Sequence, residues 1–253
     1  MPEGITMKKD LIIILSFALL LNSCEKESAS DKSSSTGAGG SAARFTISGN
    51  FLYSVGNTSL KSFDISNPAA APVLKSTIDV GVDIESIFPY QDKLFIGSSR
   101  SMYIYSLSNP EQPAKLAKAD YPVRMSCEPV VAKDSTSYST LNTNGPGAGG
   151  VSQLVVFDIK DITKPVLKAS LRLINPGGLG ISDTALYVCD GPQLLVYNIH
   201  NTYSPQLHRT ITGETFFDVI PYGNILICQV SGGIALYDIS TRYQPVFLSK
   251  VLN

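Results

Sequence analysis

The side chains that could do chemistry in this sequence are few and widely spread. The chain has two histidines and four cysteines. They are His200, His208, Cys24, Cys127, Cys189 and Cys228. No two cysteines have the Cys-x-x-Cys spacing, so the usual zinc site of cysteines and histidines is not expected. We therefore expect no metal and no cofactor, and we expect Cys189 and Cys228 to be small buried residues of strands.

Acid–base groups are no better arranged for catalysis. The carboxylates are scattered, the two histidines lie close together after one apolar segment, and no Gly-x-Ser-x-Gly nucleophile motif occurs. Hydrolysis at neutral pH normally needs a base with a pKa near 7, a metal-bound water or an activated nucleophile. The sequence therefore indicates a protein that is not an enzyme. A carboxylate pair formed by Glu85 and Glu128 is the one catalytic arrangement left open.

Composition and charge narrow the class of protein further. Of the 253 residues, 43% are hydrophobic and 16% charged, which is typical of a globular chain. The formal net charge is −1 and no basic stripe occurs, so nucleic-acid binding is not expected. The 15 prolines, 20 glycines and 22 Tyr or Phe residues favour many short strands and turns.

A repeat determines which elements would position these residues. An apolar strand, an aromatic, a small or polar residue, an aliphatic and a turn ending at proline recur in that order. The five copies are Phe63-Asp64-Ile65, Tyr105-Ser106-Leu107, Phe157-Asp158-Ile159, Tyr197-Asn198-Ile199 and Tyr237-Asp238-Ile239. Their aromatics lie 42, 52, 40 and 40 residues apart. The Asp or Asn after the aromatic is expected to bond to the backbone of its own turn.

Each copy supplies four candidate strands. In the fifth copy they are Phe216–Pro221, Ile225–Val230, Ile234–Ile239 and Val246–Val251. The third strand is apolar at nearly every position, which is typical of a strand covered on both faces. We therefore predict an all-β fold, a five-bladed β-propeller of about 40-residue, four-stranded repeats over residues 44–253. The fifth blade would pack face to face on the first to close the ring.

The third copy is longer than the others. Its spacing predicts roughly ten extra residues within residues 134–150, a stretch rich in Gly, Asn and Ser. A long loop on a repeat scaffold either serves binding or is disordered, and both possibilities stay open here.

The N-terminal segment predicts export and lipidation. Lys8-Lys9 precede an apolar run from Leu11 to Leu21 that is too short to cross a bilayer as a helix. The run ends in Leu21-Asn22-Ser23-Cys24, which resembles the lipobox of bacterial lipoproteins. That resemblance implies cleavage before Cys24 and anchoring through acyl chains on that residue. An ordinary secretory signal is the alternative, and either Met1 or Met7 could be the start.

Three segments follow from these observations. Residues 1–23 are expected to be a signal peptide, and residues 24–43 a lipidated cysteine with a disordered, flexible Ser/Gly-rich tether. The repeats over residues 44–251 resemble the LVIVD-repeat lipoproteins of Bacteroidetes, a family associated with β-propellers. The resemblance rests on the third strand of all five copies and on the segments Arg124–Val131 and Asn175–Ile181. It implies an outer-membrane lipoprotein on the periplasmic or cell-surface side, and it brings no activity.

A binding site is expected where the first strands of the blades begin. Six residues begin or precede these strands: Arg44, Glu85, Arg124, Glu128, Asn175 and Asp218. Charged groups that converge on a channel mouth could hold a polar ligand, whereas a plain solvated rim is the alternative. We expect a monomeric, membrane-anchored binding module for a protein or polysaccharide. The alternatives are a propeller hydrolase that uses the rim carboxylates and a structural subunit of an outer-membrane complex.

Overall fold

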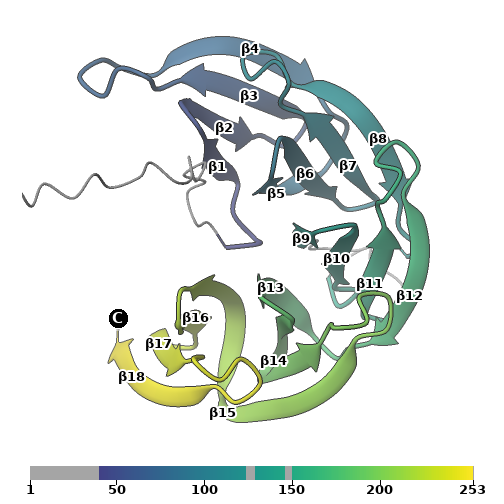
Figure 1. Cartoon of the computed structure of the whole chain (residues 1–253), viewed down its shortest axis with the longest axis vertical. Coiled ribbons are helices and arrows are strands. Elements are labelled where there is room, and N and C mark those ends of the chain that lie inside the picture. The colour runs from purple at the N-terminus through teal and green to yellow at the C-terminus, as the bar shows by residue number, and fades with distance from the viewer. Residues whose placement is uncertain (1–39, 124–128, 146–149, 253) are drawn as a thin grey trace, which may run out of the picture. The chain divides into compact units, whose positions relative to one another are not determined.

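The computed structural model describes residues 40–123, 129–145 and 150–252, which belong to one compact unit of antiparallel strands (Figure 1). The all-β prediction is confirmed, because every regular element in these ranges is a strand. A helix long and apolar enough to cross a membrane is not found in them.

Three sheets have four strands each, paired in chain order. Unit one contains β1 (Phe45–Ser48), β2 (Phe51–Val55), β3 (Ser59–Asp64) and β4 (Val73–Asp79). Unit two contains β5 (Ile84–Tyr90), β6 (Lys93–Ser98), β7 (Ser101–Ser106) and β8 (Ala114–Asp120). Unit three contains β9 (Val130–Lys133), β10 (Thr136–Leu141), β11 (Gln153–Asp158) and β12 (Val166–Arg172).

Unit three corrects the position of the insertion. Residues 136–141 were expected to belong to an inserted loop, but they form strand β10, and all six are buried. The reason is that Tyr138 occupies the place that Tyr53 has in β2, so this Ser/Thr-rich stretch completes a sheet despite its polar composition. The extra residues lie between β10 and β11, and residues 146–149 of that connection are outside the described ranges.

The fourth sheet has six strands: β13 (Pro176–Ser182), β14 (Ala185–Asn198), β15 (Gln206–Tyr222), β16 (Ile225–Val230), β17 (Gly233–Asp238) and β18 (Val246–Leu252). The chain of β14 folds back on itself, since the N–H of Ile199 donates to the carbonyl of Thr184 at 2.8 Å. The start of β15 pairs with β14, whereas Phe216–Tyr222 pairs with β16. We call β13, β14 and the start of β15 unit four, and the rest of the sheet unit five.

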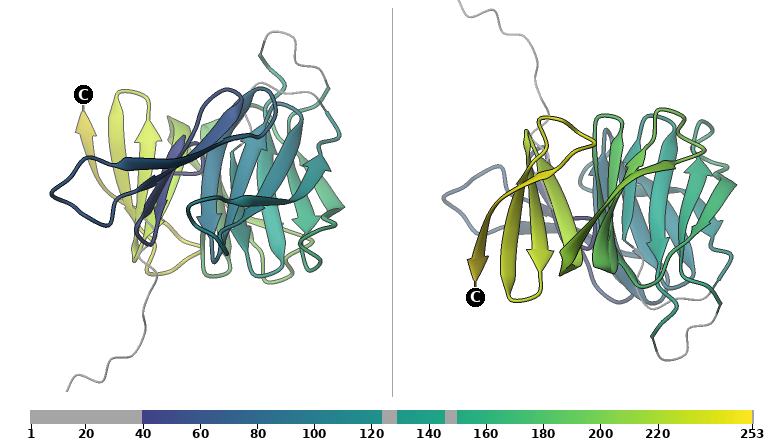
Figure 2. Two further views of the ribbon diagram at one scale, coloured as in Figure 1. Left: turned by 90° about the horizontal axis from the view of Figure 1, so that it is seen from above. Right: turned by 90° about the horizontal axis from the view of Figure 1, so that it is seen from below.

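Consecutive units pack face to face, as the views in Figure 2 show. Four hydrophobic clusters fill the four seams, from units one and two through to units four and five. Strands of the middle units are therefore buried on both faces, as in β10 and β11. Strands β1, β5, β9, β13 and Phe216–Tyr222, which we call the inner strands, lie nearest the centre (Figure 1).

The turn bonds predicted after the third strands are confirmed. The Asp64 carboxylate accepts from the N–H of Ser66 at 2.9 Å, and Asp238 accepts from Ser240 at 2.7 Å. Asp158 and Asn198 make the same bond, and in unit two the hydroxyl of Ser106 replaces the carboxylate. These short side chains close each strand and fix the turn that follows it.

The expected packing of unit five on unit one is wrong for the described part of the chain. None of its hydrophobic clusters joins these two units, and Phe45 of β1 is 63% exposed. In Figure 1 an opening separates unit five from unit one. A short segment before β1 bridges part of this opening instead.

Candidate functional site

The bridge consists of residues 40–43, which we call the strap. The Ser41 side chain is only 1% exposed, and its hydroxyl accepts from the N–H of Leu179 at 2.7 Å. The same hydroxyl donates to the Asp218 carboxylate at 3.3 Å. At the other end of the strap, the carbonyl of Ala43 accepts from the N–H of Ile87 at 2.9 Å. The strap therefore contacts the inner strands of units two, four and five.

Asp218 is the most perturbed carboxylate that faces the strap. Hydrogen bonds from Val219, Ser41 and Ala42 favour its charged form, but burial outweighs them and raises its pKa to about 6. The carboxylate lies between Gly40 and Gly178, where a Cβ atom on either residue would collide with it. Glycine is required at both positions because the strap, β13 and β15 approach one another so closely.

A cavity of about 330 Å³ lies between the inner strands of units two to five. Ser41 and Leu179 form its buried end. Tyr90, Lys133 and Asp183 lie at the other end, where the inner strands finish and the side chains reach solvent. Ser41 of the strap thus lies at the buried end of the cavity, and the more exposed lining residues lie near the turns that follow the inner strands.

The wall of the cavity is mainly apolar. Its side chains include Phe88, Pro89, Val131, Ala132, Ile181, Val219, Ile220 and Pro221. Polar groups occur at the mouth, where the Tyr90 hydroxyl accepts from the N–H of Asp134 at 2.6 Å and Lys133 pairs with Asp134 at 3.3 Å. An apolar wall with a few polar groups is the usual chemistry of a small-molecule site, in which the polar groups set the orientation of the ligand.

The expected rim residues fall into separate places. Arg44 donates to the carbonyl of Ile84 at 2.9 Å and lies near Glu85. Burial raises the pKa of Glu85, while the Arg44 charge opposes that rise. The side-chain oxygen of Asn175 accepts from Asn142 and Asn144 at 3.0 and 3.1 Å, and so holds the insertion of unit three.

Among the four rim residues that the structure describes, it brings Arg44 and Glu85 together. Asp218 belongs to the strap contact, whereas Arg124 and Glu128 lie outside the described residues. Sequence reasoning missed the mouth residues Tyr90, Lys133 and Asp183. The signal that could have found them is their shared place at the end of an inner strand, at or just before its turn.

The two cysteines that the structure describes are buried, and the two histidines are exposed. Cys189 and Cys228 are free and buried, as predicted. Burial raises the pKa of the Cys189 thiol, and it raises the pKa of Cys228 to about 12, so neither forms a nucleophilic thiolate near neutral pH. His200 and His208 are exposed on the periphery, and His208 lies 5.0 Å from the Tyr243 ring. Cys24 and Cys127 lie outside the described residues.

Charge clusters give no further site in the described ranges. These ranges contain no group of three or more His, Cys, Asp or Glu residues that could bind a metal ion.

Comparison with known proteins gives a match to one repeat and similarity in fold. The LVIVD repeat matches residues 39–80, while a search of curated proteins finds no match. A Lactobacillus plantarum protein of solved structure is 16% identical with a TM-score of 0.62, over 81% of this chain and 68% of that one. The periplasmic gluconolactonase of Pseudomonas aeruginosa is 15% identical with a TM-score of 0.61, over the same shares.

A third solved structure is more distant. BamB of Moraxella catarrhalis is 12% identical with a TM-score of 0.51, over 80% of this chain and 58% of that one. At these identities the likeness shows the fold alone. The chain therefore has one match to the LVIVD repeat, over residues 39–80, and a propeller-like fold.

Proposed function

We propose that the protein is a lipid-anchored binding module that holds a small, mainly apolar ligand in the axial cavity. The observation that carries the proposal is the cavity itself, because its wall is apolar, Ser41 lies at its buried end and a few polar groups line the mouth. Such a pocket is large enough for a ligand of about ten to twenty heavy atoms. This mainly apolar cavity is a different place from the charged rim that the sequence suggested as the binding site.

We further propose that each of the five units is one blade of the propeller. The return of β14 on itself and the change of partner along β15 support this count, since they repeat the four-stranded pattern twice within the six-stranded sheet. The residues that link the third strand to the start of the second make the same backbone bond in all five units.

Anchoring through Cys24 to the outer membrane, on its periplasmic or cell-surface side, completes the proposal. Residues 25–39 separate Cys24 from the strap, and fifteen fully extended residues span at most about 50 Å. The propeller would therefore stay close to the bilayer. Expressed in a bacterial host, the protein should incorporate labelled fatty acid, and the Cys24→Ala variant should not. Equal labelling of both would refute the anchor.

The ligand site is tested by filling the cavity. Ligand-observed NMR with small apolar probes that carry one polar group, such as indole, p-cresol and octanoate, should detect binding. Ile181→Trp places an indole in the cavity wall and should abolish the signal. Ile174→Trp is the matched control, because Ile174 is 64% exposed and does not line the cavity. Binding that survives Ile181→Trp in a folded protein would exclude the cavity.

A hydrolase is the second candidate, and the raised pKa of Glu85 is the observation that favours it. A hydrolase and glycosidase screen should include Glu85→Gln and Glu128→Gln. Turnover that either substitution abolishes would favour catalysis over binding. A binding module should show no turnover in the wild-type protein.

A further inference from the structure

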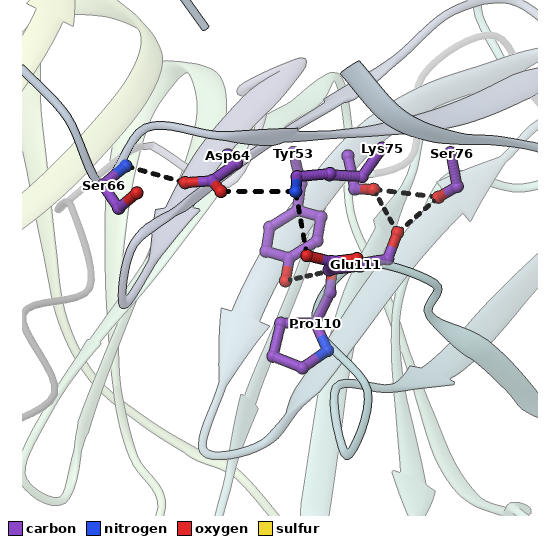
Figure 3. Close-up of polar contacts among 8 residues, drawn as sticks. Tyr53, Asp64, Ser66, Lys75, Ser76, Pro110 and Glu111 are labelled. Carbon is purple, nitrogen blue, oxygen red and sulfur yellow. Dashed lines mark hydrogen bonds and ion pairs between the residues drawn. The ribbon is translucent and has the colours of Figure 1, made fainter. Parts of the chain in front are cut away.

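Three of the four seams between units contain the same hydrogen bond at one edge. The hydroxyl of a second-strand tyrosine donates to a backbone carbonyl in the turn that follows the third strand of the next unit. Figure 3 shows this bond between units one and two, where Tyr53 donates to the carbonyl of Pro110 at 3.0 Å. In the seams that follow units three and four, the bonds run from Tyr138 to Thr202 at 2.9 Å and from Tyr187 to Arg242 at 2.7 Å.

The seam between units two and three lacks this bond because a phenylalanine takes the place of the tyrosine. Phe95 pairs with Ile104 of β7, the residue before the repeat aromatic of its unit. Tyr138 has the same register in unit three, where it pairs with Val156 of β11. Phe95 is therefore the counterpart of the three tyrosines, and it has no hydroxyl to donate.

The turn on the other side of this seam keeps its usual form. Ile162 lies five residues after the repeat aromatic, at the position of the three acceptors Pro110, Thr202 and Arg242. The N–H of Lys164 donates to the carbonyl of Asp161 at 2.9 Å, and the equivalent bonds of units two, four and five are 3.1, 3.1 and 2.9 Å long. This seam has therefore lost the donor and kept the turn that holds the acceptor.

A pocket of about 380 Å³ lies at the place of the missing hydrogen bond, since both Phe95 and Ile162 line it. We call it the seam pocket. Phe95 and Ile159 are buried, whereas Ile162 is partly exposed and Lys160 is exposed. The seam pocket therefore has a buried apolar floor and a rim that reaches solvent.

Two lysines line the seam pocket. Lys93 pairs with Asp92, which lies outside the lining. Lys160 has no carboxylate within ion-pair distance in the described part of the chain, and its Nζ lies 6.0 Å from the centre of the Tyr203 ring. Lys160 is thus a positive charge that an anion in the pocket can approach.

Tyr90 separates the seam pocket from the axial cavity, because its side chain lines both. The Asp134 carboxylate also lines the seam pocket, but it pairs at 3.3 Å with Lys133, which lines the axial cavity. With two lysines and one aspartate, the lining of the seam pocket is net positive. It therefore favours a negatively charged ligand.

We propose that the seam pocket is a second binding site, for a small organic anion that has an apolar body and a hydrogen-bond donor. The apolar body lies on Phe95 and Ile159. The donor bonds to the carbonyl of Ile162 in place of the missing tyrosine hydroxyl, and the anionic group faces Lys160. The site goes beyond the axial cavity, and either of the two can exist without the other.

Binding of p-hydroxybenzoate, measured by calorimetry at low salt, tests the site. The full chain carries Ile181→Trp in every sample, because this substitution fills the axial cavity and does not touch the lining of the seam pocket. One site should be detected. Phe95→Tyr adds the hydroxyl that the other three seams contain and should abolish binding. It should not lower the thermal midpoint, since the new hydroxyl can donate to the carbonyl of Ile162.

Phe157→Tyr is the matched control for Phe95→Tyr. Phe157 belongs to the same hydrophobic cluster but does not line the seam pocket, and units two, four and five have tyrosine at this position. Binding of p-hydroxybenzoate should therefore be retained. Equal losses in the two variants would overturn the assignment of the site to this pocket.

Lys160→Gln tests the charge, and it keeps the proposal testable if Phe95→Tyr fails to fold. It should weaken binding of p-hydroxybenzoate by about two- to fivefold, as expected for an exposed ion pair, and leave binding of the neutral p-hydroxybenzamide unchanged. Equal effects on the acid and the amide would overturn the anionic ligand. No binding before Phe95 is changed, or binding that survives Phe95→Tyr, would overturn the site. Neither result bears on the axial cavity, which Ile181→Trp fills in every sample.

Discussion

At the scale of single residues, Asp218 has the most unusual environment in the cavity region. The sequence placed it on an open rim, but it lies beneath the strap, and its partner Ser41 is 177 residues away along the chain. A contact over that separation leaves no local pattern, so the sequence could not predict it. The residue types were informative even so, because the two glycines at the start of β13, Gly177 and Gly178, mark the close approach of β13 to β15.

The raised pKa of Asp218 makes the stability of the fold depend on pH. The pKa is about 6 in the folded protein and 3.8 for a free side chain, so the folded state holds its proton more tightly than the unfolded state. The contribution of this carboxyl to stability is then greatest below about pH 4 and is lost as the pH rises through 6, by up to about 3 kcal/mol from a shift of roughly two units. Above about pH 6 the destabilising effect of the buried, ionised Asp218 carboxylate no longer changes with pH.

Asp218→Asn should remove this dependence, since the amide carries no charge. The variant should match the wild type near pH 4 and exceed it at pH 7 in the free energy of unfolding measured with urea. Ser41→Ala keeps the carboxylate and should retain the decline between pH 4 and pH 6. An Asp218→Asn difference that is the same at both pH values would show that the carboxylate is ionised at a normal pKa.

At the scale of strands, the sequence predicted unit five almost residue by residue. Strand β16 has the predicted bounds, and β18 extends one residue beyond them. The pattern succeeded because Ile, Leu and Val residues between Gly-containing turns identify strands with little ambiguity. It failed at β10, because Thr136–Leu141 is rich in hydroxyl side chains and is buried by its neighbours on both sides, which the sequence of the strand alone does not reveal.

The hydrogen bond from Tyr187 of unit four to Arg242 of unit five gives a test at the same scale. Tyr187→Phe removes the hydroxyl that donates to the carbonyl of Arg242, and it leaves that carbonyl without this partner. We expect a loss of about 0.5–1.5 kcal/mol in the free energy of unfolding, the usual contribution of one intramolecular hydrogen bond. Tyr222→Phe is the control, because Tyr222 is 66% exposed, and it should change stability very little. Equal effects of the two substitutions on the free energy of unfolding would mean that the hydrogen bond from Tyr187 to Arg242 contributes little to stability.

At the scale of the whole molecule, the inner strands enclose a cavity that no single unit contains. Units two to five each contribute one strand to the wall of the cavity, and Ser41 of the strap lies at its buried end. The sequence predicted that function would lie on the axis of a propeller, and it named the end where the inner strands begin. The more exposed lining residues lie at the other end, and the strap was expected to be part of a flexible tether.

The central claim is that this axial cavity binds small apolar ligands. A crystallographic fragment screen of the protein tests it most directly, because the screen shows where ligands bind whatever the natural ligand is. Fragments should gather in the cavity, in contact with Phe88, Ile181 and Val219 and with a polar group directed to Lys133 or Asp183. Fragments that bind elsewhere while the cavity stays empty would contradict the claim.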